Sequence, residues 1–178
     1  EMIAREMNCF KWWQKNKALS NLRKAAQLHD IGKIAIPDSV LNKVGRLTNE
    51  EYAKMKSHVI SGAEILKDFT LVENVEDGTR CHHERYDGNG YPEGLKGEKI
   101  PLFARIICVA DTFDAMTSNR VYRSTMDTDY VMNEMKRGRG TQFDPNALDA
   151  FLRLVEKGVI DTELKARIDA YYEQYGAR

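Results

Sequence analysis

Apolar residues recur at intervals of three and four along most of this chain, which is the pattern of amphipathic helices. No segment shows the strict alternation of a half-buried strand. The sequence therefore predicts an all-α protein whose helices form a bundle. The predicted helices cover residues 1 to about 7, about 20 to 36, 38 to 44, 49 to 65, about 71 to 83, 101 to 117, 128 to 136, 145 to about 158 and 161 to 175.

Polar residues mark the ends of several of these helices. Thr48 and Glu51 have the spacing of a capping box, in which each side chain bonds the backbone of the other residue. Asp144 before Pro145 pairs a capping side chain with a first-turn proline. Asp38 is expected to cap a short helix, and Asp127 or Thr128 the helix that runs to Lys136.

The pattern changes between residues 84 and 101, where four glycines and two prolines interrupt the apolar periodicity. We expect a long ordered loop or a small hairpin here. It follows directly after two adjacent histidines, so its polar residues are expected to lie near them.

A chain of 178 residues with 42% hydrophobic composition suits one globular domain. We divide it into an N-terminal remnant of an upstream helix with an aromatic connector, a main domain and a C-terminal helix, at residues 1–19, 20–158 and 159–178. Because it begins with glutamate, we expect a piece of a longer polypeptide. The connector aromatics are more typical of core or neighbour packing than of a docking face: Phe10, Trp12 and Trp13.

Composition excludes some classes of function. The 27 Lys and Arg residues balance the 27 Asp and Glu residues, which argues against general nucleic-acid binding. The three cysteines form no CxxC pair, which favours a reducing cytoplasm, and Cys81 is interpreted as a small buried residue rather than a ligand. No apolar run reaches the roughly 18 residues of a membrane span, so no membrane contact is expected.

Candidate chemistry lies in the four histidines, which all occur in short polar signatures. Asp30 and Asp111 accompany them in otherwise apolar stretches, where an unpartnered carboxylate would be costly. The set is His29, Asp30, His58, His82, His83 and Asp111, at intervals of about one helix and one turn. Imidazoles with carboxylates are ligands for Fe, Mn, Co, Ni or Zn. Adjacent pairs suit two neighbouring metals, with a carboxylate such as Asp30 as bridge, an arrangement typical of phosphoester hydrolysis.

Three segments carry a resemblance to a known family: LHDIGKIAIPD, HHERYDGNGYP and VADTFDAMTSNRVYR. They resemble the HD-GYP branch of the HD phosphohydrolase superfamily, and the likeness runs from about Leu22 to Phe151. The resemblance implies an all-α bundle that holds two or three divalent ions, with Fe or Mn favoured. It also implies hydrolysis of cyclic di-GMP to pGpG or GMP by metal-activated hydroxide. Some relatives prefer cyclic GMP-AMP.

The resemblance also assigns roles by position. The six histidines and aspartates above would be metal ligands, Asp30 and Lys33 would be catalytic, and Lys33 would touch the scissile phosphate. Gly90, Tyr91 and Pro92 would border the substrate, and Arg120 with Arg123 would bind phosphate. Three residues are expected to support the ligands or shape the loop: Glu84, Arg85 and Asp87.

The sequence departs from the family at one point. The family supplies a further histidine about thirty residues before the HD pair, but residues 1–28 contain none. Either that ligand lies upstream in a longer polypeptide, which the initial glutamate favours, or the centre is incomplete; we expect weak activity where the ligand is missing. The expected partners are an upstream sensory or regulatory domain of the same polypeptide and a diguanylate cyclase domain. One alternative is a receptor or protein-interaction module without turnover. Another is a nucleotide phosphohydrolase of the same superfamily that acts on other substrates, and the GYP segment argues against this second alternative.

Overall fold

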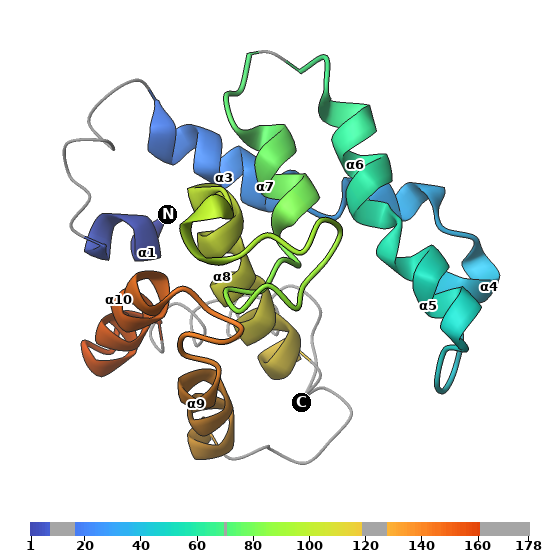
Figure 1. Ribbon diagram of the computed structural model, residues 1–178. Helices are drawn as coiled ribbons and strands as arrows, with labels where there is room; N and C mark the ends of the chain where they lie inside the picture. The colour runs from blue at the N-terminus through green and yellow to red at the C-terminus, as the bar shows by residue number, and fades with distance from the viewer. Residues whose placement is uncertain (8–16, 70, 119–127, 161–178) are drawn as a thin grey trace, which may run out of the picture.

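The computed structural model describes residues 1–7, 17–69, 71–118 and 128–160, and throughout these ranges the fold is all-α, as predicted. The only strand-like contact in the described residues is an isolated bridge between Arg139 and Phe143. The helices, labelled as in Figure 1, are α1 (Met2–Glu6), α3 (Ala18–Leu28), α4 (Asp38–Leu41), α5 (Asn49–Lys56), α6 (His58–Leu66), α7 (Val75–Cys81), α8 (Leu102–Ser118), α9 (Thr128–Arg137) and α10 (Pro145–Glu156). Two short 3₁₀ helices add to these, η1 (Ile31–Ala35) and η2 (Gly97–Lys99).

Helix α8 lies at the centre of the bundle, where it contacts α3, α7, α9 and α10 (Figure 1). Its apolar face is almost fully buried, with Phe103 and Ile107 each 2% exposed. Leu22 of α3 and Phe151 of α10 belong to the same core. Burial of each such side chain contributes about 1.5–3 kcal/mol. The helix that carries Asp111 is therefore firmly held.

Two glycines allow η1 and α6 to pack backbone against backbone. A Cβ atom on Gly32 would lie 1.9 Å from the carbonyl oxygen of His58 and 2.4 Å from the amide nitrogen of Gly62. A Cβ on Gly62 would meet the side chain of Thr79 at 2.7 Å. Only glycine fits such an approach. These contacts fix the HD segment against α6 and α6 against α7.

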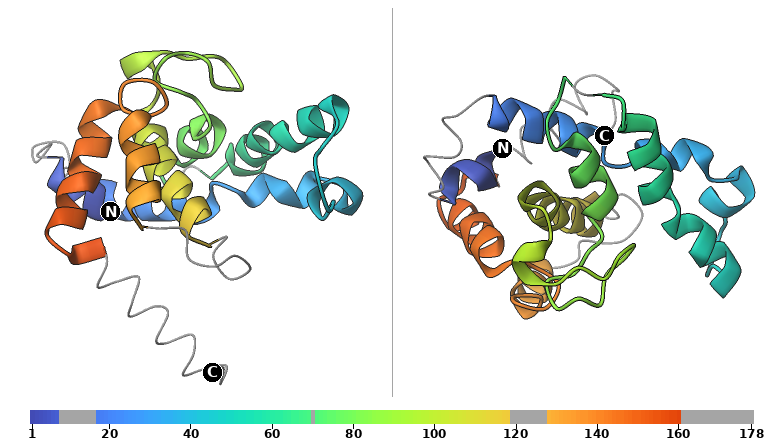
Figure 2. Two further views of the ribbon diagram at one scale, coloured as in Figure 1. Left: turned by 90° about the horizontal axis from the view of Figure 1, so that it is seen from below. Right: turned by 45° about the horizontal axis from the view of Figure 1, so that its top comes forward.

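Helices α4 and α5 form an arm at the end of the molecule opposite α1 and α10 (Figure 2). Helix α5 contains no buried residue, and Val44 before it is 99% exposed. In α4, Val40 is buried, and polar contacts add to the hold on the arm. Thr48 and Glu51 form the predicted capping box, with Thr48 N donating to Glu51 Oε2 over 2.7 Å, and Lys43 pairs with the same carboxylate.

Other predicted boundaries are also confirmed. Helix α8 occupies the predicted range almost residue for residue, and Asp144 caps α10 by accepting a hydrogen bond from Asn146 N over 2.7 Å. Segment 84–101 is an ordered loop with the single turn η2. No helix among the described residues combines the length and the apolar character that a membrane crossing needs.

The predicted ends of some helices were wrong. The helix predicted to run through His29 and Asp30 ends at Leu28, and η1 follows. The helix predicted over 49–65 is two helices separated at Ser57. Both breaks lie where Gly32 meets the backbone of His58, so tertiary packing overrides the continuous apolar pattern.

Two further starts differ from prediction. Helix α7 begins at Val75 rather than near Leu71, and α4 spans only Asp38–Leu41. Asp38 lies in the first turn of α4, after the extended Pro37, and makes no capping hydrogen bond. Phe10, Trp12, Trp13, Asp127 and the predicted helix 161–175 lie outside the described residues. The division into three segments stays a prediction.

Candidate metal centre

The six predicted ligands converge from five elements. His29 and Asp30 lie between α3 and η1, His58 is the first residue of α6, His82 and His83 follow α7, and Asp111 lies in α8. The Nε2 atom of His29 lies 3.3 Å from Asp30 Oδ2 and 3.5 Å from Asp111 Oδ1. Each adjacent pair, His29 with Asp30 and His82 with His83, lies at a helix end.

Three of the histidines are oriented in the same way. The Nδ1 atoms of His29, His58 and His82 each lie 2.7 Å from the carbonyl oxygen three residues earlier, in Ala26, Met55 and Thr79. A carbonyl oxygen can only accept, so Nδ1 carries the proton and donates. This fixes the tautomer and leaves Nε2 facing the centre of the cluster. A ligating imidazole is commonly held by such a second hydrogen bond.

The inward-facing atoms lack hydrogen bonds to the described residues. Six buried side-chain nitrogen or oxygen atoms in the described residues have no hydrogen bond. Four of them belong to this cluster: Nε2 of His29, His58 and His82, and Oδ1 of Asp30. Buried polar atoms are usually satisfied, and an unsatisfied group costs about 1–3 kcal/mol. Nitrogen and carboxylate donors pointing at one another across a few ångströms fit a divalent metal ion.

Asp30 lies between two groups of donors. Its Oδ1 is 3.4 Å from His58 Nε2 and 3.9 Å from His82 Nε2, and its Oδ2 faces His29. Two sets of ligand atoms each lie within 4.8 Å of one another, His58 with His82 and His83, and His29 with Asp30 and His82. The geometry thus agrees with the interpretation of Asp30 as a bridging carboxylate.

Burial and charge set the protonation of the imidazoles. Burial lowers the pKa of His82 to about 3 and that of His83 to about 4, and it also lowers the pKa of His58. These rings are neutral at pH 7 and can offer a lone pair to a cation. Burial works against protonation of His29, but the carboxylates of Asp111 and Asp30 outweigh it and raise its pKa to about 10.

The carboxylates are ionised. Burial opposes the charge on Asp30 and Asp111, yet His29 lowers the pKa of both, and Lys33 lowers that of Asp30 further. Lys33 Nζ contacts Asp30 Oδ2 at 2.5 Å. The cluster also lies at the C-terminal ends of α3 and α7, where helix dipoles favour positive charge. The two carboxylates face the positive charges of His29 and Lys33, and together with the neutral imidazoles they are groups that could hold a metal ion.

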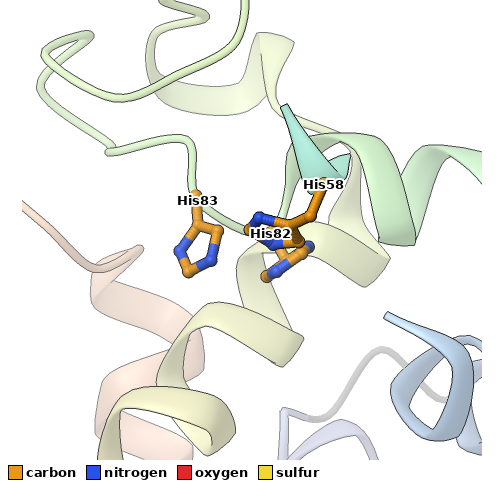
Figure 3. Close-up of side chains that lie close together, drawn as sticks. All are labelled: His58, His82 and His83. Carbon is orange, nitrogen blue, oxygen red and sulfur yellow. The ribbon is translucent and has the colours of Figure 1, made fainter. Parts of the chain in front are cut away.

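His83 is held differently from the other three histidines. Figure 3 shows its ring beside those of His58 and His82, at the start of the loop that leaves α7. Its ring centroid lies 4.1 Å from that of His82 and 5.2 Å from that of His58. Tyr91 stacks on it, with centroids 4.9 Å apart and an interplanar angle of 26°.

The loop after His83 is organised by Glu84, which is 2% exposed. The carboxylate of Glu84 accepts hydrogen bonds from Glu93 N over 2.7 Å and Leu95 N over 3.0 Å. Arg85 pairs with Asp87, which in turn accepts from Asn89 N. Glu84, Arg85 and Asp87 therefore shape the loop. The peptide bond before Pro92 is cis.

A cavity of about 380 Å³ lies beside the cluster. His29 and Asp111 form part of its wall, and apolar side chains such as Ile107 and Phe151 form much of the remainder. Asp114 also faces it, and no Lys or Arg among the described residues lines it. This described part of the wall is therefore unfavourable for a phosphate group.

The structure brings together all six predicted ligands, with Lys33 against Asp30 and Tyr91 against His83. Gly90 packs on the backbone of Glu84 and Arg85. Arg120 and Arg123 lie outside the described residues. Cys81 is buried, burial raises the pKa of its thiol to about 12, and it belongs to neither group of donors.

Sequence reasoning missed two features near the cluster. Lys56 places its ammonium 5.6 Å from the centre of the Tyr91 ring and 5.0 Å from that of Tyr52, and no signal in the sequence indicated this. The close approach at Gly32 had a signal, a glycine inside an apolar helical pattern.

Comparison with known proteins adds a family. The HD domain model matches residues 1–147. The cyclic di-GMP phosphodiesterase response regulator RpfG of Xanthomonas campestris is 49% identical over 135 residues, 74% of this chain and 35% of that protein. The 3'3'-cGAMP-specific phosphodiesterase 2 of Vibrio cholerae is 38% identical over 133 residues, 74% of this chain and 26% of that protein.

A solved structure shares the fold. The cyclic GMP-AMP specific phosphodiesterase V-cGAP3 of Vibrio cholerae aligns with a TM-score of 0.63 at 22% identity, over 92% of this chain and 46% of that chain. The chain spans about a third of the length of the curated relatives that it matches. The aligned region covers 35% of RpfG and 34% of a probable cyclic di-GMP phosphodiesterase of Vibrio cholerae.

Proposed function

This chain belongs to the HD domain family, and we propose that it hydrolyses a phosphodiester bond of cyclic di-GMP at a centre of divalent metal ions. One observation carries the proposal. Three imidazole Nε2 atoms and one carboxylate oxygen converge in a buried cluster, and none of them has a hydrogen bond to the described residues. A phosphodiesterase of this kind needs such an arrangement before its ions bind.

Bound ions would supply positive charge beside the phosphate and lower the pKa of a water molecule. The protein contributes the arrangement. His29, Asp30 and Asp111 would hold one side of the centre, and His58, His82 and His83 the other, with Asp30 between them. The backbone carbonyls behind three imidazoles keep their Nε2 atoms in place, so little reorganisation is required on binding.

Among the described residues, Lys33 is the cation best placed to assist. Its ammonium contacts Asp30, and 42% of its side chain is exposed, so a phosphate oxygen can approach it from solvent. We propose that it binds a nonbridging oxygen of the scissile phosphate and stabilises the charge that develops there. The phosphate side of the site would then lie at Lys33, away from the cavity lined by Asp111 and Asp114.

The finer assignments remain proposals. We favour Fe or Mn because the resemblance to the HD-GYP family implies these ions, and mixed imidazole and carboxylate ligands are compatible with them. Relatives named for cyclic di-GMP and for 3'3'-cGAMP both match this chain, and the higher identity to RpfG supports cyclic di-GMP. RpfG is named a response regulator, which supports a regulatory domain in the same polypeptide. Contacts of Gly90, Tyr91, Pro92, Arg120 and Arg123 with the substrate stay predictions.

Hydrolysis can be tested directly. The chain, alone and within any longer polypeptide that contains it, is loaded with Mn²⁺ or Fe²⁺ and incubated with cyclic di-GMP and with cyclic GMP-AMP. Chromatography should show linear pGpG or GMP, formed faster from cyclic di-GMP. Asp30→Ala should abolish turnover, whereas Asp38→Ala, which removes an exposed carboxylate of α4, should not. Tight nucleotide binding without turnover under either metal would contradict the proposal and support a receptor.

A further inference from the structure

The orientation of His83 is not explained by hydrogen bonds. In the part of the chain that the structure describes, the other three histidines each anchor Nδ1 on a backbone carbonyl, but neither ring nitrogen of His83 has a hydrogen-bond partner. His83 is also less buried than His82, which is 1% exposed. A ligand histidine needs some contact that fixes its ring.

Tyr91 supplies that contact. Its ring lies nearly parallel to that of His83, with centroids 4.9 Å apart, and its amide nitrogen donates to the His83 carbonyl oxygen over 3.3 Å. We propose that Tyr91 is a positioning residue that orients His83 by ring stacking, in the role that carbonyl oxygens have for the other three histidines. This inference rests on the proposed metal centre.

The loop is built to place Tyr91 there. A Cβ atom on Gly90 would lie 2.3 Å from Arg85 N and 2.5 Å from Glu84 Cα, so only glycine lets the chain return this close to the residues after His83. Beyond Tyr91, Glu84 ties down Glu93 and Leu95. The loop is thus fixed on both sides of the tyrosine.

Contacts around Tyr91 indicate that its ring matters more than its hydroxyl group. In the described residues, the hydroxyl makes no hydrogen bond, whereas the ring contacts His83 and lies 5.6 Å from Lys56 Nζ. A cation near the ring adds a favourable electrostatic contact. Phenylalanine at this position should therefore keep the effect, and an aliphatic residue should lose it.

The test compares Tyr91→Phe, Tyr91→Leu and the control Tyr52→Leu. Tyr52 contacts the same Lys56 but is 50% exposed, and its ring stacks on no histidine ring among the described residues. Each protein is titrated with Co²⁺ and followed by its absorption spectrum. Tyr91→Leu should lower the Co²⁺ affinity of the site formed by His58, His82 and His83 about tenfold. The Co²⁺ affinity of the other two variants should stay within about threefold of the parent's. Tyr91→Leu should also lower kcat more than it raises KM.

NMR spectroscopy of the unmodified, metal-free protein tests the same contact without any variant that could fail to fold. Nuclear Overhauser contacts should connect the Tyr91 ring protons with those of His83, and the His83 protons should be shifted upfield by the adjacent ring. Absent contacts, or unchanged Co²⁺ affinity in a folded Tyr91→Leu, would overturn the positioning role. An equal loss in Tyr91→Phe would overturn it too, because the hydroxyl group would then be the active part. If the parent itself bound no ion, the proposed function would fail first.

Discussion

Two sets of buried polar side chains in this molecule differ in how their atoms are satisfied. Asp144, 1% exposed, accepts from Asn146 N and pairs with Arg105, and Glu84 accepts from two amides of its loop. His58 and His82 are equally buried, at 2% and 1%, yet their Nε2 atoms have no hydrogen bond within the described residues. Burial alone does not separate the two sets.

The difference separates structural from functional polarity. A buried carboxylate whose oxygens are all paired stabilises the fold, and its removal leaves other groups unsatisfied. Buried nitrogens without partners contribute nothing comparable to the fold, so their arrangement is better explained by a ligand. Variants in the first set should therefore lose stability, and variants in the second should lose metal binding and activity.

The largest expected effect is that of His82→Gln, because His82 belongs to both groups of donors. Loss of both metal positions should reduce hydrolysis of cyclic di-GMP by at least about 10³-fold, which corresponds to roughly 4 kcal/mol of transition-state stabilisation. Calorimetric titration with Mn²⁺ should show weaker binding. A variant with near-normal activity would place the chemistry elsewhere.

Asp144→Ala should have the opposite profile. It removes one partner of a buried ion pair and the cap of α10, so the free energy of unfolding should fall by about 3–5 kcal/mol. Urea denaturation measures this. The control is Asp149→Ala, which breaks an exposed pair with Arg139 and should cost less than about 1 kcal/mol. The Mn²⁺ affinity of the folded Asp144→Ala protein should match that of the parent. A large drop in this affinity would contradict the separation of structural from functional polar groups.

Glu84→Gln should have an intermediate effect, since an amide cannot accept from both Glu93 N and Leu95 N with two oxygens. We expect a loss of about 1–3 kcal/mol in unfolding free energy. Hydrogen exchange at the amides of Glu93 and Leu95 should become faster. Glu98→Gln, at an exposed position of η2, is the matched control and should change neither quantity.

The smallest expected effect is that of Thr48→Ala on the arm. Loss of the capping box should cost about 1 kcal/mol, and Thr48→Ser should restore most of it. Hydrolysis should stay at the parent's rate, because α5 reaches the cluster only through its C-terminal end. A clear loss of activity in Thr48→Ala would mean that the arm contributes to the site.

Local signals predicted much of this fold. The capping box at Thr48 and the Asp144–Pro145 helix start depend on residues a few positions apart, and both are confirmed. Helix α8 was predicted because its apolar run is long. The breaks at His29 and Ser57 were not predicted, since they depend on Gly32 meeting a backbone 26 residues away in sequence.

The site shows the same division. Histidine and aspartate signatures, together with the family resemblance, predicted which residues meet. They did not predict which atoms face inward, because that depends on backbone carbonyls near the ends of α3, α5 and α7 that accept from the Nδ1 atoms. The stacking of Tyr91 on His83 and the place of Lys56 depend on how the loop returns.

Anomalous diffraction from crystals grown with Mn²⁺ tests the central claim most directly. We predict anomalous peaks in coordinating contact with Nε2 of His82 and with the Asp30 carboxylate, and no such peaks in crystals of Asp30→Ala. Crystals that contain Mn²⁺ only at surface carboxylates, with the same Nε2 atoms hydrogen-bonded to water, would contradict the account.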